Sequence, residues 1–330
     1  MDGKIKIAMF DTKPFDKESF DKYNGKSVAI KYFDAKLDES TARLTKGFDC
    51  VVVFVNDEVT EKVIETLVRY GVRLLALRCA GFNNVDLKSA EGRINVVRVP
   101  AYSPQAVAEH TIAMLMTSVR RIHKAYNRTR EYNFSLEGLK GFELCGKTMG
   151  IIGAGKIGRV VIDICNGLGM KVLYHDKFVN GIVNAESVSL KKLFKESDVI
   201  SLHCPLSEDN YHMINAKTID TMKTGVIILN TSRGALIDAE DLLSGIKSKK
   251  IGGACLDVYE EETDIFFNDR SGHILKDDIL ARLLTMPNVI LTSHQAFLTE
   301  EALENIAETT ISNVLNFFNG EKIKNENFII

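Results

Sequence analysis

A glycine-rich hexapeptide, Gly153-Ala154-Gly155-Lys156-Ile157-Gly158, constrains the fold of this chain more than any other stretch. It follows a short apolar run, Met149–Ile152, and opens a segment of helical periodicity, Lys156–Leu168. In such a strand–turn–helix unit the first glycine permits a tight turn, the second lets the backbone approach a pyrophosphate, and the third lets helix and strand pack closely. The helix N-terminus can then face the phosphates of a dinucleotide. The residues expected at these phosphates are Gly153, Gly155, Lys156, Ile157 and Gly158.

An acidic residue stands where a dinucleotide-binding fold uses one to recognise ribose. Asp176 follows the expected strand Lys171–His175 and lies 18 residues past Gly158. Its carboxylate can accept hydrogen bonds from the adenosine ribose hydroxyls, and it would repel a 2′-phosphate. Lys177 beside it would offset part of that repulsion. We therefore predict NAD rather than NADP as the cofactor. An ordinary glycine-rich turn followed by a strand-end acid is the simpler alternative.

Short apolar runs alternate with helical segments along nearly the whole chain, as is typical of α/β proteins with parallel sheets. A length of 330 residues indicates two domains. We expect a small α/β domain from the first third and a doubly wound Rossmann arrangement of six strands from the rest. The first set of expected strands is Ile5–Phe10, Cys50–Val55, Leu74–Leu77 and Val96–Val99. The second set is Met149–Ile152, Lys171–His175, Val199–His203, Val226–Asn230, Ala254–Val258 and Val289–Thr292.

The boundary between the domains is expected where two prolines, Pro100 and Pro104, interrupt the chain. Ser103 is a candidate N-cap for one long helix that continues through Ala106–Arg130, apolar in its first half and basic in its second. If the final helix, Glu300–Phe318, packs on the first domain, that domain contains both ends of the chain. The expected fold is thus two Rossmann-like domains with a cleft between them: a substrate domain of residues 1–100 and 299–330, and a NAD-binding domain of residues 101–298.

Composition excludes several classes of protein. With 45% hydrophobic residues the chain is not disordered, and 42 basic against 44 acidic side chains give no reason to expect a nucleic acid partner. The opening residues Met1–Gly3 lead into Ile5–Phe10 without a signal-peptide h-region, and no apolar run has the roughly 18 residues of a membrane span. The six cysteines form no Cys-x-x-Cys pair, so we expect reduced core thiols in a cytoplasmic protein.

Three polar side chains follow neighbouring strands of the second expected sheet: Arg233, Glu262 and His294. Ligands of a doubly wound sheet meet the carboxyl ends of its strands. A guanidinium can clamp a carboxylate bidentately, an imidazole can donate a proton near neutral pH, and a carboxylate beside the imidazole can orient it. Singly, each residue has a simpler interpretation: an arginine paired with Asp238, a solvated acid, a core histidine. Together they predict chemistry on a 2-keto acid.

Three stretches at these strand ends resemble the signature segments of the D-isomer-specific 2-hydroxyacid dehydrogenases: Thr231–Gly234, Asp257–Glu262 and His294–Phe297. The similarity covers nearly the full length of the chain. It also includes the segments Arg78–Asp86, Val99–Pro104 and Phe134–Leu139. A further segment, Asp264–Asp278, resembles the branch of that family that acts on lactate. Such a set of motifs is very specific.

The resemblance implies a role for each matching residue. Arg233 would bind the substrate carboxylate, and His294 would be the acid/base with Glu262 as its partner. The further cofactor residues would be Cys204, Pro205, Asn210, Thr231, Ser232 and Asp257, with Asp257 near the nicotinamide carboxamide. The further substrate residues would be Ala80 and Gly81, through backbone amides, and Tyr102 and Phe297, around a small side chain.

The resemblance also implies the reaction, which is reversible reduction of pyruvate to D-lactate by NADH. No metal is expected, because the guanidinium and the imidazolium supply the positive charge. A homo-oligomer, at least a dimer through the cofactor domain, is implied, and the helix from Ala106 could supply that contact or pack within its own subunit. Two alternatives stay open. One is the same reaction on a larger or branched 2-keto acid, and the other is a NAD-sensing corepressor, against which the complete Arg/Glu/His set argues.

Overall fold

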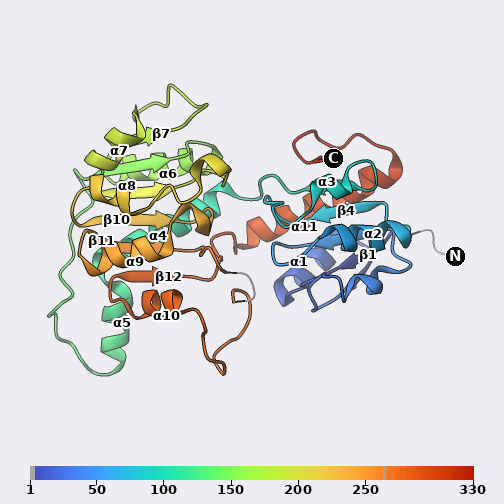
Figure 1. Ribbon diagram of the computed structural model, residues 1–330, viewed down its shortest axis with the longest axis horizontal. Helices are drawn as coiled ribbons and strands as arrows, with labels where there is room; N and C mark the ends of the chain where they lie inside the picture. Colours follow the sequence, from blue (N-terminus) through green and yellow to red (C-terminus); the bar gives the residue numbers. More distant parts are fainter. Residues whose placement is uncertain (1–3, 263–264) are drawn as a thin grey trace. The chain divides into compact units, whose positions relative to one another are not determined.

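The computed structural model of the chain describes residues 4–262 and 265–330. The first residues, Met1–Gly3, and the first residue of the lactate-type segment, Asp264, lie outside this range. The chain divides into two compact units (Figure 1): unit 1 is Met1–Ser103 with Phe297–Ile330, and unit 2 is Pro104–Ala296. Each unit is built on one parallel sheet with helical crossovers, so the predicted α/β class with doubly wound parallel sheets is confirmed.

The sheet of unit 2 has seven parallel strands in the order β12-β11-β10-β9-β6-β7-β8. Their bounds are β6 (Thr148–Ile152), β7 (Lys171–His175), β8 (Glu186–Ser187), β9 (Val199–Leu202), β10 (Val226–Asn230), β11 (Ile251–Leu256) and β12 (Val289–Leu291). The order reverses between β6 and β9, which is where a doubly wound sheet opens a crevice for its ligand. The prediction of six strands missed β8, because its two residues are exposed and carry no apolar pattern.

Two separate apolar cores cover the two faces of this sheet. Helices α4 (Pro104–Arg120) and α6 (Lys156–Gly167) contribute to the core on one face, with Leu115 and Val161 fully buried. The other core includes Leu193, Ile219, Leu242 and Leu280. These four come from α7 (Leu190–Glu196), α8 (Ala216–Thr221), α9 (Ala239–Lys247) and α10 (Asp278–Thr285). Burial on both faces explains why the strands of this sheet read as continuous apolar runs.

The expected single helix over Ala106–Arg130 is wrong. Helix α4 begins at Pro104 and ends at Arg120, and a separate helix, α5 (Ile122–Arg130), follows it. Arg121 between them has a left-handed φ of 55°, which ends the hydrogen-bond ladder of α4. Helix α5 has no buried residue, and Figure 1 shows it projecting beyond the sheet of unit 2. The basic second half of the predicted helix therefore lacked the packing that would have continued it.

The sheet of unit 1 has five parallel strands in the order β2-β1-β3-β4-β5, which is also a doubly wound order. The strands are β1 (Lys6–Met9), β2 (Ala29–Tyr32), β3 (Cys50–Val53), β4 (Leu74–Leu77) and β5 (Asn95–Arg98). The helices are α1 (Pro14–Asn24), α2 (Glu61–Arg69), α3 (Leu87–Ala90) and α11 (Glu300–Asn319), with a 3-10 turn at Ala42–Thr45. The sequence pattern did not indicate β2 or α1, because β2 has no buried residue and α1 is rich in charged side chains.

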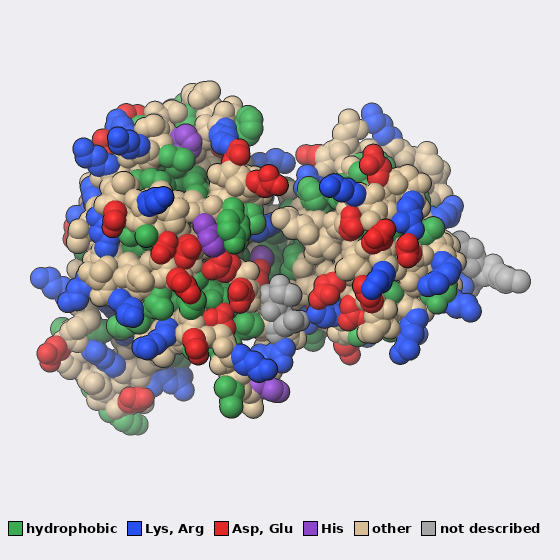
Figure 2. Space-filling view, viewed as in Figure 1, with side chains coloured by type: hydrophobic (Ala, Val, Ile, Leu, Met, Phe, Trp, Pro, Cys, Tyr) green, Lys and Arg blue, Asp and Glu red, His purple; other side chains and the backbone are tan. Residues whose placement is uncertain are grey.

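The surface and the cysteines add two observations. Figure 2 shows basic and acidic side chains mixed over the visible face of each unit, in keeping with a net charge of −2. Among the described residues, no helix combines the length and apolar character that crossing a bilayer requires. All six cysteines are free thiols, but Cys145 is exposed, so the expectation of six core thiols is wrong for that residue.

Candidate active site

The glycine-rich hexapeptide forms the turn between β6 and α6. Gly153 has a φ of 94°, and a Cβ there would lie 2.6 Å from the backbone nitrogen of Cys204. A Cβ on Gly158 would lie 2.1 Å from the carbonyl oxygen of Gly153. Only glycine fits at either position, because the loop after β9 and the first turn of α6 both press on this turn.

The outer side of the same turn is open. Gly155 is exposed, and a Cβ there would meet no atom of the described residues within 4 Å. Lys156 and Ile157 are the first two residues of α6, and no side chain caps this helix end in the part of the chain that the structure describes. The first backbone N–H groups of a helix have no partner within it, so this N-terminus can receive an anion such as a phosphate.

Asp176 follows β7 and holds the glycine-rich turn in place. Its Oδ2 accepts the N–H of Ala154 at 2.7 Å, and its Oδ1 accepts the N–H groups of Phe178 and Val179 at 2.8 and 2.9 Å. Burial would raise the pKa of Asp176, but these amides outweigh it and hold the pKa below its ordinary value. The carboxylate is therefore charged and fixed in direction, and it keeps lone pairs for ribose hydroxyls.

Cys204, Pro205 and Asn210 lie on the segment after β9. Asn210 closes this segment on itself, since its Nδ2 donates to the carbonyl of Pro205 at 2.8 Å and its Oδ1 accepts the N–H of Ser207 at 2.7 Å. Burial raises the pKa of the Cys204 thiol to about 11, so this side chain is neutral at physiological pH. The segment borders Gly153, at the reversal of strand order.

Thr231, Ser232 and Arg233 follow β10, and Asn230 shapes their turn. Nδ2 of Asn230 donates to the carbonyl of Arg233 at 2.8 Å, and its Oδ1 accepts the N–H of Ser232 at 3.0 Å. The hydroxyl of Ser232 donates to the carbonyl of Cys204 at 2.6 Å, which joins the turns after β9 and β10. The Arg233 guanidinium donates only to the carbonyl of Ser232 within the described residues. Its other N–H groups are thus available to an anionic ligand.

Glu262 and His294 form a hydrogen-bonded pair at the ends of β11 and β12. His294 Nδ1 lies 2.7 Å from Glu262 Oε1, and the side chains are 19% and 22% exposed. The second carboxylate oxygen accepts the N–H of Tyr259 at 3.0 Å, which fixes the direction of the carboxylate. No protein atom of the described residues bonds His294 Nε2. A carboxylate on one nitrogen keeps a proton there and leaves the other nitrogen to exchange a proton with a ligand.

The backbone at His294 is left-handed, with a φ of 54°, which is uncommon for a residue other than glycine. Asp257 holds this conformation through three bonds. Its carbonyl accepts the N–H of His294 at 2.7 Å, and its carboxylate accepts the N–H groups of Gln295 and Ala296 at 2.9 and 2.8 Å. The residue that the sequence assigned to the nicotinamide carboxamide therefore also fixes the loop that carries His294.

The carboxylate of Asp257 is fully buried and charged. Oδ1 also accepts the hydroxyl of Thr292 at 2.5 Å, and His110 Nε2 lies 3.4 Å from the same oxygen. Burial would raise the pKa of Asp257, but the hydrogen bonds from His110, Thr292 and the two amides outweigh it and hold the pKa below its usual value.

Three of the four expected substrate residues of unit 1 follow strands of its sheet, and the fourth, Phe297, lies shortly before α11. Ala80 and Gly81 follow β4, and Cys79 Sγ lies 3.3 Å from the carbonyl oxygen of Gly81. Tyr102 follows β5 and contacts Phe297 edge to face, with ring centroids 6.1 Å apart. The structure thus brings Tyr102 and Phe297 together within unit 1.

The chain is similar to known proteins over nearly its full length. The model of the family described as D-isomer specific 2-hydroxyacid dehydrogenase, NAD binding domain, matches residues 112–296. A 2-hydroxyacid dehydrogenase homolog of Haemophilus influenzae is 51% identical over 326 residues, 97% of this chain and 98% of that protein. D-lactate dehydrogenase of Escherichia coli strain K12 is 50% identical over 327 residues, 98% and 99% of the two chains. The chain belongs to the D-isomer-specific 2-hydroxyacid dehydrogenases.

A solved structure agrees with this membership. The apo structure of D-lactate dehydrogenase from Escherichia coli superposes on this dehydrogenase with a TM-score of 0.90 and 47% identity, over 99% of this chain and 100% of that one. The family resemblance read from the motifs is therefore confirmed, and so is NAD as the cofactor. The open glycine-rich turn, the uncapped N-terminus of α6 and the charged Asp176 are the features that fit NAD in this dehydrogenase.

Several residues that sequence reasoning missed lie against the expected site of the dehydrogenase. In unit 2, His110 and Thr111 on α4 bond Thr292 and Thr231 at 3.2 and 2.9 Å. Their spacing inside a long apolar helix gave no sign of this. In unit 1, Phe15 and Phe54 join Tyr102 around Phe297, with ring centroids 6.5 and 5.9 Å from it. An aromatic residue directly after β3 was the one available signal for Phe54.

Proposed function

We propose that the chain is a D-lactate dehydrogenase, which reduces pyruvate to D-lactate with NADH in a reversible reaction. The observation that carries this proposal is the Glu262–His294 pair, in which His294 Nε2 has no partner among the described residues. Arg233 follows β10 and His294 follows β12, and only β11 lies between these two strands. Both side chains therefore lie at the same edge of one sheet. The D-lactate dehydrogenase of Escherichia coli, which is 50% identical over nearly the full length, supports the choice of substrate.

The proposed mechanism assigns one task to each residue. Arg233 binds the carboxylate of pyruvate through the N–H groups that no protein atom of the described residues occupies. His294, protonated, donates the proton on Nε2 to the carbonyl oxygen as negative charge develops there. Glu262 on Nδ1 orients the ring and stabilises its positive charge. NADH, when bound, supplies the hydride. In the reverse direction, neutral His294 accepts the proton of the lactate hydroxyl.

NADH preference over NADPH follows from the charge of Asp176. The proposed contacts of the cofactor run along the open turn Gly153–Gly158, the segment Cys204–Asn210 and the turn Thr231–Ser232, with Asp257 near the carboxamide. Asp176 is ionised and held by three amides, so it cannot turn away from a 2′-phosphate without losing those bonds. The low pKa and the fixed direction of this carboxylate support the proposal.

A small substrate side chain is proposed from the residues of unit 1, which we assign as the substrate domain. Backbone amides at Ala80 and Gly81 would bind the substrate carboxylate, and Tyr102 and Phe297 would surround the methyl group. The aromatic rings gathered on Phe297 support a pocket with little room for a larger group. A larger or branched 2-keto acid is the competing substrate in the experiment below.

A cytoplasmic homo-oligomer is the proposed state of the protein, with no nucleic acid or membrane as partner. Six free thiols support a reducing compartment. The segment from α5 onward carries exposed apolar side chains, among them Tyr126 at 58%, Phe134 at 71% and Leu136 at 81%. Such a set of exposed apolar residues is typical of an interface, and the segment is our candidate contact between two copies. Sedimentation equilibrium of the purified protein measures the oligomeric state.

The test of the proposed function is a panel of 2-keto acids offered with NADH and with NADPH, followed by chiral analysis of the product. Pyruvate with NADH is expected to give the highest kcat/KM, and the product is expected to be D-lactate. A higher kcat/KM with a branched 2-keto acid would reassign the substrate. Binding of NADH without turnover of any keto acid would favour the corepressor instead.

A further inference from the structure

The last residues of the chain pair with the edge of the sheet of unit 1. After α11 the chain turns at Gly320, where φ is 72°, and its tail runs antiparallel to β5, the edge strand of the sheet. Val97 pairs with Phe328, the N–H of Val96 donates to the carbonyl of Ile330 at 2.8 Å, and the N–H of Arg98 donates to the carbonyl of Asn327 at 2.8 Å. The tail thus covers the hydrogen-bonding edge of β5.

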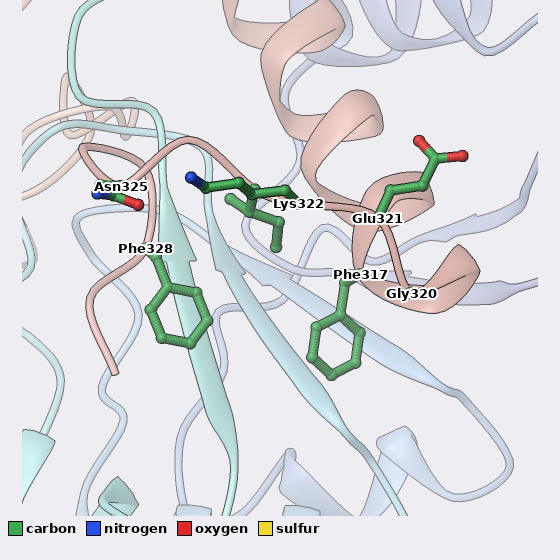
Figure 3. A pocket seen from close by; sticks show the side chains of 7 residues that line it. Phe317, Gly320, Glu321, Lys322, Asn325 and Phe328 are labelled. Carbon is green, nitrogen blue, oxygen red and sulfur yellow. The ribbon is translucent and has the colours of Figure 1, made fainter.

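The tail, residues 321–330, forms backbone hydrogen bonds with β5, and a hollow separates its end from the last turn of α11. Figure 3 shows Phe317 on α11 and Phe328 on the tail on two sides of a hollow of about 450 Å³, which Lys322 and Asn325 also line. The buried amide of Asn327 adds a second anchor, because it donates to Asn313 Oδ1 at 2.8 Å, and Asn313 Nδ2 donates to the carbonyl of Arg98 at 3.1 Å. Both anchors meet at Arg98.

The side chain of Arg98 connects this tail to the loop after β4. Its Nη1 donates to the carbonyl of Ala80 at 3.0 Å, and its Nε donates to the carbonyl of Glu326 at 3.4 Å. The guanidinium also lies over the ring of Phe82, 5.1 Å from its centroid. One planar group therefore contacts two points of the loop Cys79–Phe82 and one point of the tail.

The bond to Ala80 has a direct geometric consequence. The carbonyl of Ala80 and the N–H of Gly81 belong to the same peptide group, which is planar and trans, so the two point in opposite directions. Holding the oxygen on one side therefore fixes the direction of the N–H on the other side. That N–H is one of the two amides proposed to bind the substrate carboxylate.

We infer that Arg98 is a positioning residue for the substrate: it holds the Ala80–Gly81 peptide so that the Gly81 N–H faces the substrate carboxylate, and the C-terminal tail holds Arg98. The inference rests on the proposed function, because it takes the ligand of Gly81 to be a 2-keto acid. It names a residue that touches neither the reacting atoms nor the cofactor.

The test is steady-state kinetics of Arg98→Met, with NADH binding followed by its fluorescence. Loss of the charged donor frees the peptide plane, so KM for pyruvate is expected to rise about tenfold, with kcat and the Kd of NADH within about twofold of wild type. Arg98→Lys keeps an N–H donor for Ala80 and is expected to recover part of the loss. Asn327→Ala loosens the backbone of Arg98 and is expected to raise KM about threefold.

A matched control is Arg73→Met. Arg73 belongs to unit 1 and its guanidinium lies over the ring of Phe318, 4.5 Å from the centroid, so its loss removes the same charge from unit 1 and a cation–π contact with α11. KM for pyruvate is expected to stay within twofold of wild type in this variant.

Two results would overturn the inference. One is a KM for pyruvate in Arg98→Met within twofold of wild type. The other is an equal change in kcat, KM and Tm in Arg98→Met and Arg73→Met, which would show a general loss of stability. If Arg98→Met does not fold, Asn327→Ala decides: a KM for pyruvate raised about threefold at unchanged kcat supports the inference, and an unchanged KM overturns it. Failure of the proposed function is seen separately, as a wild-type protein that does not reduce pyruvate.

Discussion

Two histidines of unit 2 that have carboxylate partners, His212 and His294, differ in one respect that decides their roles. His212 bonds carboxylates through both ring nitrogens, with Nδ1 3.2 Å from Asp238 and Nε2 2.7 Å from Glu260. His294 bonds a carboxylate only through Nδ1, at 2.7 Å from Glu262. Glu260 and Glu262 follow β11 and are only two residues apart, but they bond different histidines.

The difference shows what a proton-transfer site requires beyond a histidine and an acid. The ring of His212 has no nitrogen left for a ligand, and it stacks on Tyr211 with centroids 4.0 Å apart. Its backbone N–H donates to the carbonyl of Ala235 at 2.9 Å, and its partner Glu260 accepts the N–H of Ala239 at 3.1 Å. His212 therefore connects the segments after β9, β10 and β11. His294 keeps Nε2 unbonded within residues 4–262 and 265–330, and its backbone is held in a left-handed conformation by Asp257.

The strongest test of this comparison replaces each histidine by glutamine. His294→Gln removes the proposed proton donor, so kcat/KM for pyruvate is expected to fall by about 10²- to 10⁴-fold. His212→Gln is the matched control and is expected to lose less than about tenfold, because its hydrogen-bond partners Asp238, Glu260 and Ala235 are not among the proposed site residues. Stopped-flow and steady-state rates at neutral pH measure both. Equal losses in the two variants would contradict the assignment of different roles.

The next test compares the two acids. Glu262→Gln removes the negative charge at Nδ1 and disfavours the imidazolium of His294. Pyruvate reduction needs the protonated ring and lactate oxidation the neutral ring, so both limbs of the pH–rate profile are expected to move to lower pH by about one unit. At neutral pH, reduction then suffers more than oxidation.

Glu260→Gln is the control for that shift and is expected to leave both limbs in place. Rates are compared where chemistry limits turnover, since a slow conformational step would hide the limbs. Limbs of Glu262→Gln that stay unmoved or move upward would show that Glu262 is not the charge partner of His294.

His212→Gln is expected to lower the stability of the fold more than His294→Gln does, which is the opposite of their order in kcat/KM. His212→Gln breaks two bonds to carboxylates that join three segments, and the free energy of unfolding is expected to fall by about 2 kcal/mol. His294→Gln breaks one bond on a single loop and is expected to cost less. Urea unfolding at pH 7 measures both values. A more stable His212→Gln than His294→Gln would refute the connecting role of His212.

Another histidine of unit 2, His203, gives the smallest effect at neutral pH. His203 lies after β9 with Nε2 2.8 Å from the hydroxyl of Ser201, and desolvation lowers its pKa to about 4. Below pH 6.5 His203 binds a proton in the unfolded chain but stays neutral in the folded protein. The free energy of unfolding therefore falls as the pH drops from 6.5 towards 4.

His203→Gln is expected to reduce the loss of stability between pH 7 and pH 5 by about 2 kcal/mol, with little change at pH 7. Urea titrations at the two pH values measure it. An unchanged slope of stability against pH would mean that the folded protein binds this proton as well as the unfolded chain does.

Much of the site was accessible from the sequence because it lies at strand ends. The glycine-rich turn, Asp176, Arg233, Glu262 and His294 each follow an apolar run that is long enough to predict. What the sequence did not predict depends on contacts between distant segments. No local sequence pattern indicates that His212 bonds Asp238 and Glu260. None indicates that Asp257 bonds the loop of His294 either.

The fold, like the site, has elements that a local sequence pattern predicts and others that it does not. The buried parallel strands were predicted because both faces of each sheet are covered, so their residues are apolar throughout. The missed strands β2 and β8 lie at sheet edges and bury little. The break at Arg121 depends on a backbone angle that hydrophobic periodicity does not report. The tail on β5 has no helical or alternating pattern and acquires its conformation from the strand that it pairs with.

The discontinuous composition of unit 1 determines when each unit can fold during synthesis. Unit 2, Pro104–Ala296, is contiguous, so its residues are synthesised without interruption. Unit 1 needs Phe297–Ile330, which the ribosome makes only after all of unit 2, to supply α11 and the segment that pairs with β5. The first hundred residues therefore remain incomplete, with the apolar surface that α11 will cover exposed, until that segment has been made, although domains usually fold from the N-terminus onward. In a growing cell, this is the stage at which we expect the chain to depend most on chaperones.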